Sequence, residues 1–371
     1  MTPITFAMTP EERSALAASG CLEAIRSGTT TVVDPLRHVA TYAQAMADSG
    51  LRLYLSESCA DALTLQIRNS GYTYDRAWGE AFLDRARELI DGFHGMDNGR
   101  VQVMVAAHAT DNASPWILDQ LTELAQQHGL RRTIHLAQGQ GEVDQVRAAY
   151  DRTPAEYLDD HGWLSPELLG AHWSGCTDED IALLAERGVH MVHCPASGSR
   201  RGPTRQRINV MREAGVNVAL GTDNMSENMI QALNFAITMH RGAYGGGSGI
   251  PTPGDILDSA TRNGAAAIGR SADLGSVEVG KKADLTLLNL NHSSMRPISN
   301  VISNLVHYGH PGMVDSVMVD GRFLMRDGDL VGVDEAAVSQ ASQEANDAIW
   351  RRFGEEFPDV APREIVTPGV A

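Results

Sequence analysis

The sequence predicts an α/β protein: a parallel (β/α)8, or TIM-type, barrel that lacks or replaces its first strand, followed by a small C-terminal β unit. Three observations lead to this prediction. Seven short runs rich in β-branched and aliphatic residues alternate with helical patterns over residues 30–223. Polar residues lie at or just after the ends of these runs throughout the series. After residue 270 the strand–helix alternation gives way to the alternating pattern of antiparallel strands.

The strands and helices can be taken in chain order. The helical pattern at 114–129 has Ser114 as N-cap, Pro115 at its first position and Gly129 as a stop. The pattern at 177–188 opens on a capping box. Strands that alternate with such helices pair in parallel. The seven runs are TTVVD (30–34), RLYLS (52–56), QVMVAA (102–107), TIHL (133–136), LLGAH (168–172), HMVHC (190–194) and NVALGTD (217–223).

The positions of the polar residues decide between an open sheet and a closed barrel, because both fit the alternation. A barrel collects them at the C-terminal ends of all its strands, whereas an open sheet gathers them at one switch point. Nine residues precede the helical stretch at 10–27 that leads into the first run, so no strand one fits there. The barrel is favoured by His38, His108, His135, His172, His193 and Asp223, which lie at or just after the run ends.

A second kind of pattern follows the barrel. Residues 274–290 and 314–328 alternate like half-buried antiparallel strands, and Asp320-Gly321 is a hairpin signal. Residues 335–354 form a helical stretch before a proline-containing tail. The predicted division is therefore a barrel over residues 1–270, a small β subdomain over 271–330, and a C-terminal helix and tail over 331–371.

Composition and charge exclude several classes of partner. The 371 residues include 30 Lys plus Arg against 47 Asp plus Glu, and the net charge of -17 would repel a nucleic-acid backbone. No apolar run approaches the roughly 20 residues of a membrane helix, and the N-terminal residues lack a signal-peptide pattern. The 4 cysteines show no CxxC spacing. We therefore expect a reduced, cytoplasmic protein that acts on a small molecule, without nucleic-acid or membrane partners.

His135, His172 and Asp223 form the candidate site, because each lies near the C-terminal end of a different predicted strand. Imidazole and carboxylate donors on rigid elements suit a divalent ion at a hydrolytic site, and three protein ligands leave a position open for water. Each residue alone also fits a structural role, such as a hydrogen-bonded histidine or an Asx turn at Asp223. For His193 the structural role is favoured, because turn residues follow it, and no neighbour marks Cys194 as a nucleophile.

Six segments along the chain carry a resemblance to a known family. They are SGTTTVVD (27–34), HLAQ (135–138), AHWSGCTDEDIALLAERGVHMVHCPAS (171–197), ALGTDN (219–224), SATRNGAAAIG (259–269) and LGSVEVGKKADLTLL (274–288). Together they resemble the amidohydrolase superfamily, in the branch of the cytosine deaminases, adenosylhomocysteine deaminases and triazine or phenylurea hydrolases. The resemblance runs in family order from about residue 10 to residue 328. It implies a (β/α)8 barrel with a β-sandwich built from both chain ends, of which this chain keeps a C-terminal remnant, and one metal ion, zinc or iron.

The resemblance implies roles for the three converging residues. His135 corresponds to the strand-five metal ligand, and Asp223 to the strand-eight aspartate that binds metal and takes a proton from the attacking water. His172 corresponds to the strand-six histidine that supports the reaction, and we count it with the metal ligands. The implied reaction adds water to an electron-poor carbon of an N-heterocycle or a urea-like group, from which ammonia, an amine or a halide leaves.

Further residues are expected to contact the substrate or move protons. His108 corresponds to a position that faces the substrate in related enzymes, and Thr222 and Asn224 flank the catalytic aspartate. Gln138 occupies the position where deaminases carry a glutamate that shuttles protons to the leaving group. A glutamine is neutral and cannot transfer that proton. Proton delivery is then left to His172 or to water.

The family's first metal pair, a His-x-His at the end of strand one, has no counterpart here. Without it the remaining donors would hold a metal weakly. We expect that the natural protein begins further upstream and that this chain lacks the N-terminal segment. The alternative is a metal-free paralog that binds a small molecule or a partner subunit without hydrolysis, and metal-free catalysis by His172 with His135 or His108 ranks last. The unpaired strand edges predict association, most simply a homodimer.

Overall fold

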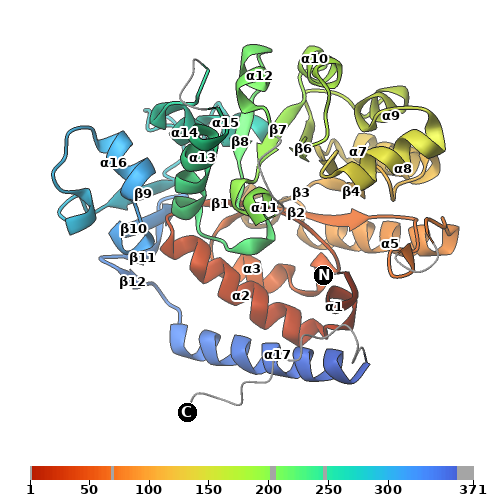
Figure 1. Ribbon diagram of the computed structural model, residues 1–371. Helices are drawn as coiled ribbons and strands as arrows, with labels where there is room; N and C mark the ends of the chain where they lie inside the picture. Colours follow the sequence, from red (N-terminus) through yellow and green to blue (C-terminus); the bar gives the residue numbers. More distant parts are fainter. Residues whose placement is uncertain (1, 68–70, 201–205, 245–248, 357–371) are drawn as a thin grey trace.

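The chain folds into a curled parallel sheet surrounded by helices, with a smaller antiparallel sheet beside it (Figure 1). The computed structural model describes residues 2–67, 71–200, 206–244 and 249–356. The main sheet has the order β1-β2-β4-β5-β6-β7-β8, and β3 pairs with β2. Its strands are β1 Thr31–Leu36, β2 Arg52–Cys59, β3 Val101–Val103, β4 Val105–Ala109, β5 Arg132–Leu136, β6 Leu168–His172, β7 His190–His193 and β8 Val218–Leu220.

Helices follow the strands in the order that the alternation predicts. The expected capping box opens α10, and Gly129 ends α7 in a left-handed conformation, as expected. None of the described helices is long and apolar enough to cross a membrane. The helices of this part are α1 Thr2–Ala7, α2 Pro10–Arg26, α3 Ala43–Asp48, α5 Arg76–Phe93, α6 Met96–Gly99, α7 Pro115–His128, α8 Gln140–Tyr150, α9 Pro154–Asp160, α10 Asp178–Glu186, α11 Pro195–Arg200, α12 Ile208–Glu213, α13 Met229–Tyr244, α14 Pro253–Ala260 and α15 Arg262–Ala267.

The predicted barrel with a missing strand is confirmed. All pairings in the main sheet are parallel. The path ends at β1 and β8, and no pairing joins these two strands in the described part of the chain. Ser27, just before β1, connects the two ends: its Oγ lies 3.1 Å from the carbonyl oxygen of Glu227 and accepts a hydrogen bond from the Met229 N–H at 3.2 Å.

The third predicted strand, residues 102–107, is two strands, so that prediction was wrong in one respect. The break falls at Met104, between β3 and β4. β3 pairs with β2 at the level of Leu53 to Leu55, whereas β4 pairs with β2 further along and also with β5. Met104 itself is buried in a cluster with Tyr54 and Leu169. The break is invisible in the sequence because Val103, Met104 and Val105 are all apolar.

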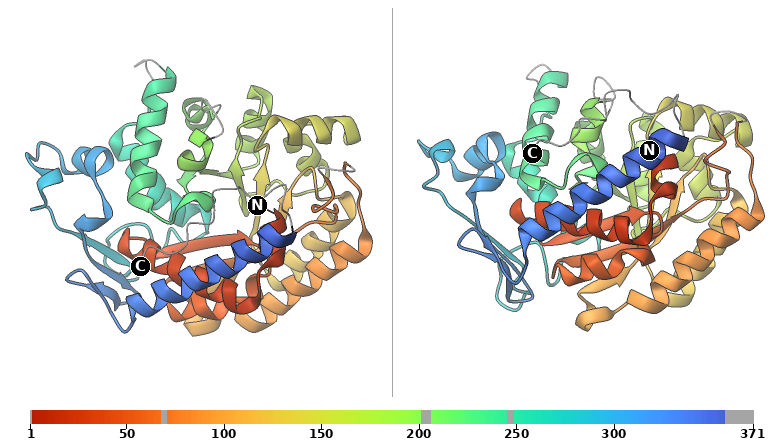
Figure 2. Two further views of the ribbon diagram at one scale, coloured as in Figure 1. Left: turned by 60° about the horizontal axis from the view of Figure 1, so that its bottom comes forward. Right: turned by 90° about the horizontal axis from the view of Figure 1, so that it is seen from below.

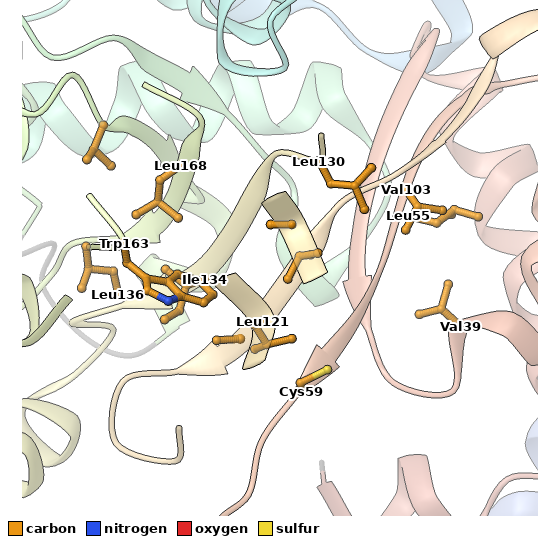
Figure 3. Close-up of a cluster of buried hydrophobic side chains, with 14 of the residues drawn as sticks. Val39, Leu55, Cys59, Val103, Leu121, Leu130, Ile134, Leu136, Trp163 and Leu168 are labelled. Atoms are coloured by element: carbon orange, nitrogen blue, oxygen red, sulfur yellow. The ribbon is translucent and has the colours of Figure 1, made fainter. Parts of the chain in front are cut away.

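The main hydrophobic core lies between the sheet and its outer helices (Figure 3). Ile134 and Leu136 of β5 point into this core together with Leu121 of α7 and the fully buried Trp163. Burying side chains of this size contributes about 1.5–3 kcal/mol each. Because side chains alternate along a strand, His135 between Ile134 and Leu136 faces the opposite side, the interior of the curled sheet.

The C-terminal β unit is an antiparallel sheet of the order β12-β11-β10-β9. The predicted hairpin is confirmed: Asp320 and Gly321, with φ of 48° and 78°, connect β10 to β11 as a type I′ turn requires. Of the predicted run 274–290 only β9 is a strand, because residues 274–284 find no partner strand in the described chain. The elements are β9 Leu285–Leu288, α16 Val301–Tyr308, β10 Val314–Val319, β11 Arg322–Arg326, β12 Asp329–Leu330 and α17 Glu335–Glu356.

The long C-terminal helix α17 confirms the helical stretch predicted at 335–354 and lies along α2 (Figure 2). The two helices run antiparallel, because Arg26 at the end of α2 pairs with Glu335 and Glu12 at its start pairs with Arg352. The predicted tail falls mostly on residues 357–371, outside the described residues. The domain boundaries at residues 270 and 330 stay a prediction.

Arg52 of β2 links the main sheet to the C-terminal β unit. Its guanidinium is fully buried and donates to both oxygens of Asp284, at 2.7 and 3.0 Å. The same group contacts Asp320 at 2.8 Å, in the turn between β10 and β11. Burying such a cation is costly unless it is paired. The two carboxylates contact Nε and Nη2, whereas Nη1 has no hydrogen-bond partner in the described chain. The pairing therefore fixes where the small sheet attaches.

We predict that Arg52→Met lowers the free energy of unfolding by about 3–5 kcal/mol, because it leaves the Asp284 carboxylate buried without its cation. The control is Arg87→Ala, which removes an exposed ion pair with Asp84 and should cost less than about 1 kcal/mol. Urea denaturation measures both. Equal effects of the two substitutions would contradict the structural role of Arg52.

Candidate functional site

A cavity of about 510 Å³ opens at the C-terminal ends of β4, β5 and β6. Its size is in the range of small-molecule sites. The predicted residues His108, Gln138 and His172 all line it. The full lining is His108, Ala109, Asp111, Asn112, Gln138, Gly139, Gln140, Glu142, His172, Ser174, Gly175, Ser197, Gly198 and Gln206.

His135 lies between two histidines of the neighbouring strands. Its ring centroid is 5.0 Å from that of His108 and 5.5 Å from that of His172, and the latter pair is stacked. Its Nδ1 lies 2.6 Å from the carbonyl oxygen of His108, which can only accept, so Nδ1 carries the proton and donates. This bond leaves Nε2 as the acceptor nitrogen of the ring. A metal-binding histidine is normally held in such a way.

His172 ends β6 in a sharp turn. It has a left-handed φ of 81°, and Trp173 follows with 54°. Such conformations cost of order 1–3 kcal/mol each. The Trp173 N–H donates to the carbonyl oxygen of Leu136 at 3.0 Å, which holds the turn against β5. The buried imidazole is positioned by Gln138, whose Nε2 lies 3.0 Å from Nε2 of His172.

Asp223 opens the short 3-10 turn η2 (Asp223–Met225) that follows β8. Its φ of 59° is left-handed. The backbone N–H of Asn224 donates to Oδ1 at 2.7 Å, whereas Oδ2 is buried and has no hydrogen-bond partner among the described residues. Buried polar atoms are almost always paired. One carboxylate oxygen is therefore oriented by the backbone and the other is available for a cation or a proton.

The donor set fits a divalent metal ion. Ligand atoms of His172, Cys194 and Asp223 all lie within 4.8 Å of one another. Imidazole, thiol and carboxylate are the ligand types of zinc-like ions. His135 lies beside this group, stacked on His172. Sequence reasoning found no neighbour that marks Cys194 as a nucleophile and missed this placement, although its position at the end of a strand run was the available signal.

Glu142, in the first turn of α8, is a second residue that sequence reasoning missed. Its carboxylate accepts hydrogen bonds from the backbone N–H groups of Ala137, at 3.0 Å, and Gln138, at 2.7 Å. The hydroxyl of Thr110 donates to it at 2.5 Å. Burial, with the nearby Asp111, raises the pKa of Glu142 to about 7. This side chain fixes the turn that carries Gln138 to His172.

Two expected substrate contacts do not line the cavity. The Thr222 hydroxyl donates to Oε2 of Glu227 at 3.3 Å. Asn224 is exposed, and its backbone serves Asp223. Both flank the aspartate in the structure as they do in the sequence. Their proposed contact with a substrate stays a prediction.

The remaining histidines at strand ends have structural surroundings. His38 packs edge-on against the ring of Phe6 at 5.2 Å, and burial lowers its pKa to about 4. His193 and His240 are both buried and contact each other, with their Nε2 atoms 3.0 Å apart. Burial also lowers the pKa of His108, which disfavours the charged form of this cavity-lining ring.

Comparisons of the sequence with known proteins agree on one family. Residues 1–324 match the profile of the Amidohydrolase family. A 5-methylthioadenosine/S-adenosylhomocysteine deaminase of Moorella thermoacetica is 35% identical over 317 residues, which cover 84% of this chain and 71% of the relative. A 5′-deoxyadenosine deaminase of Methanothermobacter thermautotrophicus is 32% identical over 338 residues, covering 89% of this chain and 75% of the relative.

Solved structures show the same fold. An adenosine deaminase from Xanthomonas campestris, with bound zinc, has a TM-score of 0.83 at 26% identity, covering 94% of this chain and 77% of the other. An atrazine chlorohydrolase from Arthrobacter aurescens, complexed with zinc, has a TM-score of 0.82 at 22% identity. The match covers 91% of this chain and 77% of the other. The second likeness concerns the fold alone.

The raised pKa of Glu142 predicts a pH-dependent stability. The protonated Glu142 side chain contributes fully to the stability of the fold below pH 4.5, the ordinary pKa of a glutamate. This contribution is lost as the pH rises through about 7, the pKa in the folded protein. Between about pH 5 and about pH 8, the free energy of unfolding of the wild-type protein should therefore fall by up to about 3 kcal/mol more than that of the Glu142→Gln variant. Urea denaturation at each pH measures this, with the exposed Glu123→Gln as control. Parallel pH curves for wild type and Glu142→Gln would refute it.

Proposed function

Because this chain belongs to the amidohydrolase family, we propose that it deaminates an adenosine-type nucleoside, replacing the amino group of the base with oxygen from water and releasing ammonia. The chain is a hydrolase that acts on carbon–nitrogen bonds other than peptide bonds. The relatives reported above that are more than 30% identical to it are named as deaminases of adenosine derivatives. Nothing in these comparisons favours the non-enzymatic alternative.

The observation that supports the proposal is the position of His172, which lines the cavity, stacks on His135 and has a ligand atom within 4.8 Å of one of Asp223. The stacked histidines and the buried, unpaired oxygen of Asp223 lie at the C-terminal ends of three different strands. The cavity volume of about 510 Å³ accommodates a nucleoside. Polar groups from four strand ends then surround the base.

The residues that would hold a divalent ion, zinc or iron, are His135, His172 and Asp223. When bound, the ion supplies the Lewis acidity that makes water a nucleophile at neutral pH. Asp223 Oδ2 takes the proton that the attacking water loses. His172, held by Gln138, stabilises the charge that develops as the water oxygen bonds to the ring carbon.

Gln138 limits the ways in which the leaving group can be protonated. Its amide can donate and accept hydrogen bonds but cannot release a proton. Its contact with His172 therefore orients the imidazole and does not shuttle protons itself. Proton delivery to the leaving amine falls to His172 or to water. The expected homodimer stays a prediction.

We predict that the protein releases ammonia from adenosine, 5′-methylthioadenosine or 5′-deoxyadenosine, and that His135→Ala lowers kcat/KM by roughly 100-fold or more. The matched control is His128→Ala, an exposed histidine at the end of α7, which should leave kcat/KM within about twofold. A chelator should abolish turnover, and added zinc should restore it. Full activity in His135→Ala, or in chelator, would refute the assigned site.

A further inference from the structure

A second cavity lies at the opposite end of the parallel strands from the candidate site. Its volume is about 290 Å³, and its wall includes residues of β2 and β3, the residues just before β5 and those just after α15. Arg131 precedes β5 and lines this cavity, whereas Gln138 follows β5 and lines the first one. Met104, at the break between β3 and β4, also belongs to the wall. The two cavities share no lining residue, so the second one is a separate place for a ligand.

Positive charge lines the second cavity, although the chain as a whole carries a net charge of -17. Arg131 and Arg270 both belong to its wall, and none of the described residues in the wall is an aspartate or a glutamate. Arg270 is neutralised by its ion pair with Asp273. Arg131 has no ion-pair partner within the described parts of the chain. Arg131 is therefore the cation with which a ligand in this cavity can pair.

Neutral groups hold the guanidinium of Arg131 in place. Its Nη2 donates to the carbonyl oxygens of Pro166, at 2.6 Å, and Ala267, at 2.9 Å. These bonds fix the orientation of the group but leave its charge uncompensated. Burial lowers the pKa of Arg131, and the carboxylate of Glu167 only partly opposes this effect. An anion beside Arg131 would offset the cost of this burial.

Other polar side chains of the wall offer hydrogen-bond donors. The Tyr54 hydroxyl accepts from Nη1 of Arg270 at 3.1 Å, so it keeps its own proton to donate. Nδ1 of His94 accepts from the backbone N–H of Val103 at 3.2 Å, so the neutral ring carries its proton on Nε2. Gln102 adds an amide that can donate or accept. A guanidinium with several neutral donors is the kind of set that binds an oxyanion.

We propose that the second cavity binds a small organic anion, with a phosphate or carboxylate group at Arg131 and an apolar body. Tyr54 and His94 donate hydrogen bonds to the oxygens of this group. The apolar body packs against Met104 and Ile268, which line the cavity and belong to one buried cluster. The volume lies just below the range of drug-sized sites, so the ligand is small. The site is independent of the proposed deamination, because none of its lining residues belongs to the candidate site.

Phenyl phosphate and benzoate test this proposal, because each joins one anionic group to a small apolar ring. In isothermal titration calorimetry we expect the wild-type protein to bind at least one of them, and the tighter binder identifies the anionic group. Inorganic phosphate and benzyl alcohol each lack one half of the ligand and should bind at least roughly 10-fold more weakly. Arg131→Gln should weaken binding of the tighter probe by at least roughly 10-fold. The matched control Arg351→Gln, at an exposed arginine of α17, should leave it within about twofold.

Gly129 offers a second pair of variants that leaves Arg131 in place. It lines the cavity with a φ of 63°, and a Cβ atom there would meet no atom within 4 Å. Aspartate and asparagine tolerate this left-handed conformation about equally. Gly129→Asp should therefore weaken probe binding by roughly 10-fold through its charge, whereas Gly129→Asn, of the same shape, should keep it within about threefold.

Three results would overturn the anion site. They are no binding of either probe to the wild-type protein, equal binding of benzyl alcohol and the tighter probe, and unchanged affinity in both Arg131→Gln and Gly129→Asp. Circular dichroism checks that each variant folds. If Arg131→Gln does not fold, the difference between Gly129→Asp and Gly129→Asn decides, and equal affinities of these two variants would then refute the proposal.

Discussion

The register of the parallel strands is the constraint on which the site depends. His172 of β6 pairs with Leu136 of β5, one position beyond His135, so the two imidazoles stack. His193 of β7 pairs with Leu220 of β8, so Cys194 follows at the level where β8 turns toward Asp223. A shift of one residue in either pairing would turn these side chains to the opposite face of the sheet.

Backbone strain accompanies this arrangement. Ala137, His172, Trp173 and Asp223 all have positive φ values, and they lie at or shortly after the C-terminal ends of β5, β6 and β8. Several hydrogen bonds hold the turns: the carbonyl oxygen of Ala137 accepts from the Gly175 N–H at 2.8 Å, and the Glu142 carboxylate accepts from the Ala137 N–H. Conformations of this kind persist only where the surroundings fix them, and they cluster at functional sites.

Local patterns in the sequence predicted most of the fold, because hydrophobic periodicity and capping are local properties. The break at Met104 and the missing partner of residues 274–284 leave no trace in local patterns, since both depend on which strands pair. The histidines and Asp223 were predicted because they end recognisable strands. Cys194 and Glu142 were missed, because one depends on the approach of Gly221 and the other on a left-handed turn at Ala137.

The contact of Ser27 with the segment after β8 has a consequence for how the protein opens. A curled sheet whose end strands are not paired has a seam, and here the hydrogen bonds of the Ser27 side chain span it where a strand ladder would otherwise lie. Asp223 lies just before that seam, whereas His135 and His172 belong to adjacent strands far from it in the sheet order. Unfolding that begins at this seam would therefore displace the Asp223 carboxylate before it separates the stacked imidazoles of His135 and His172.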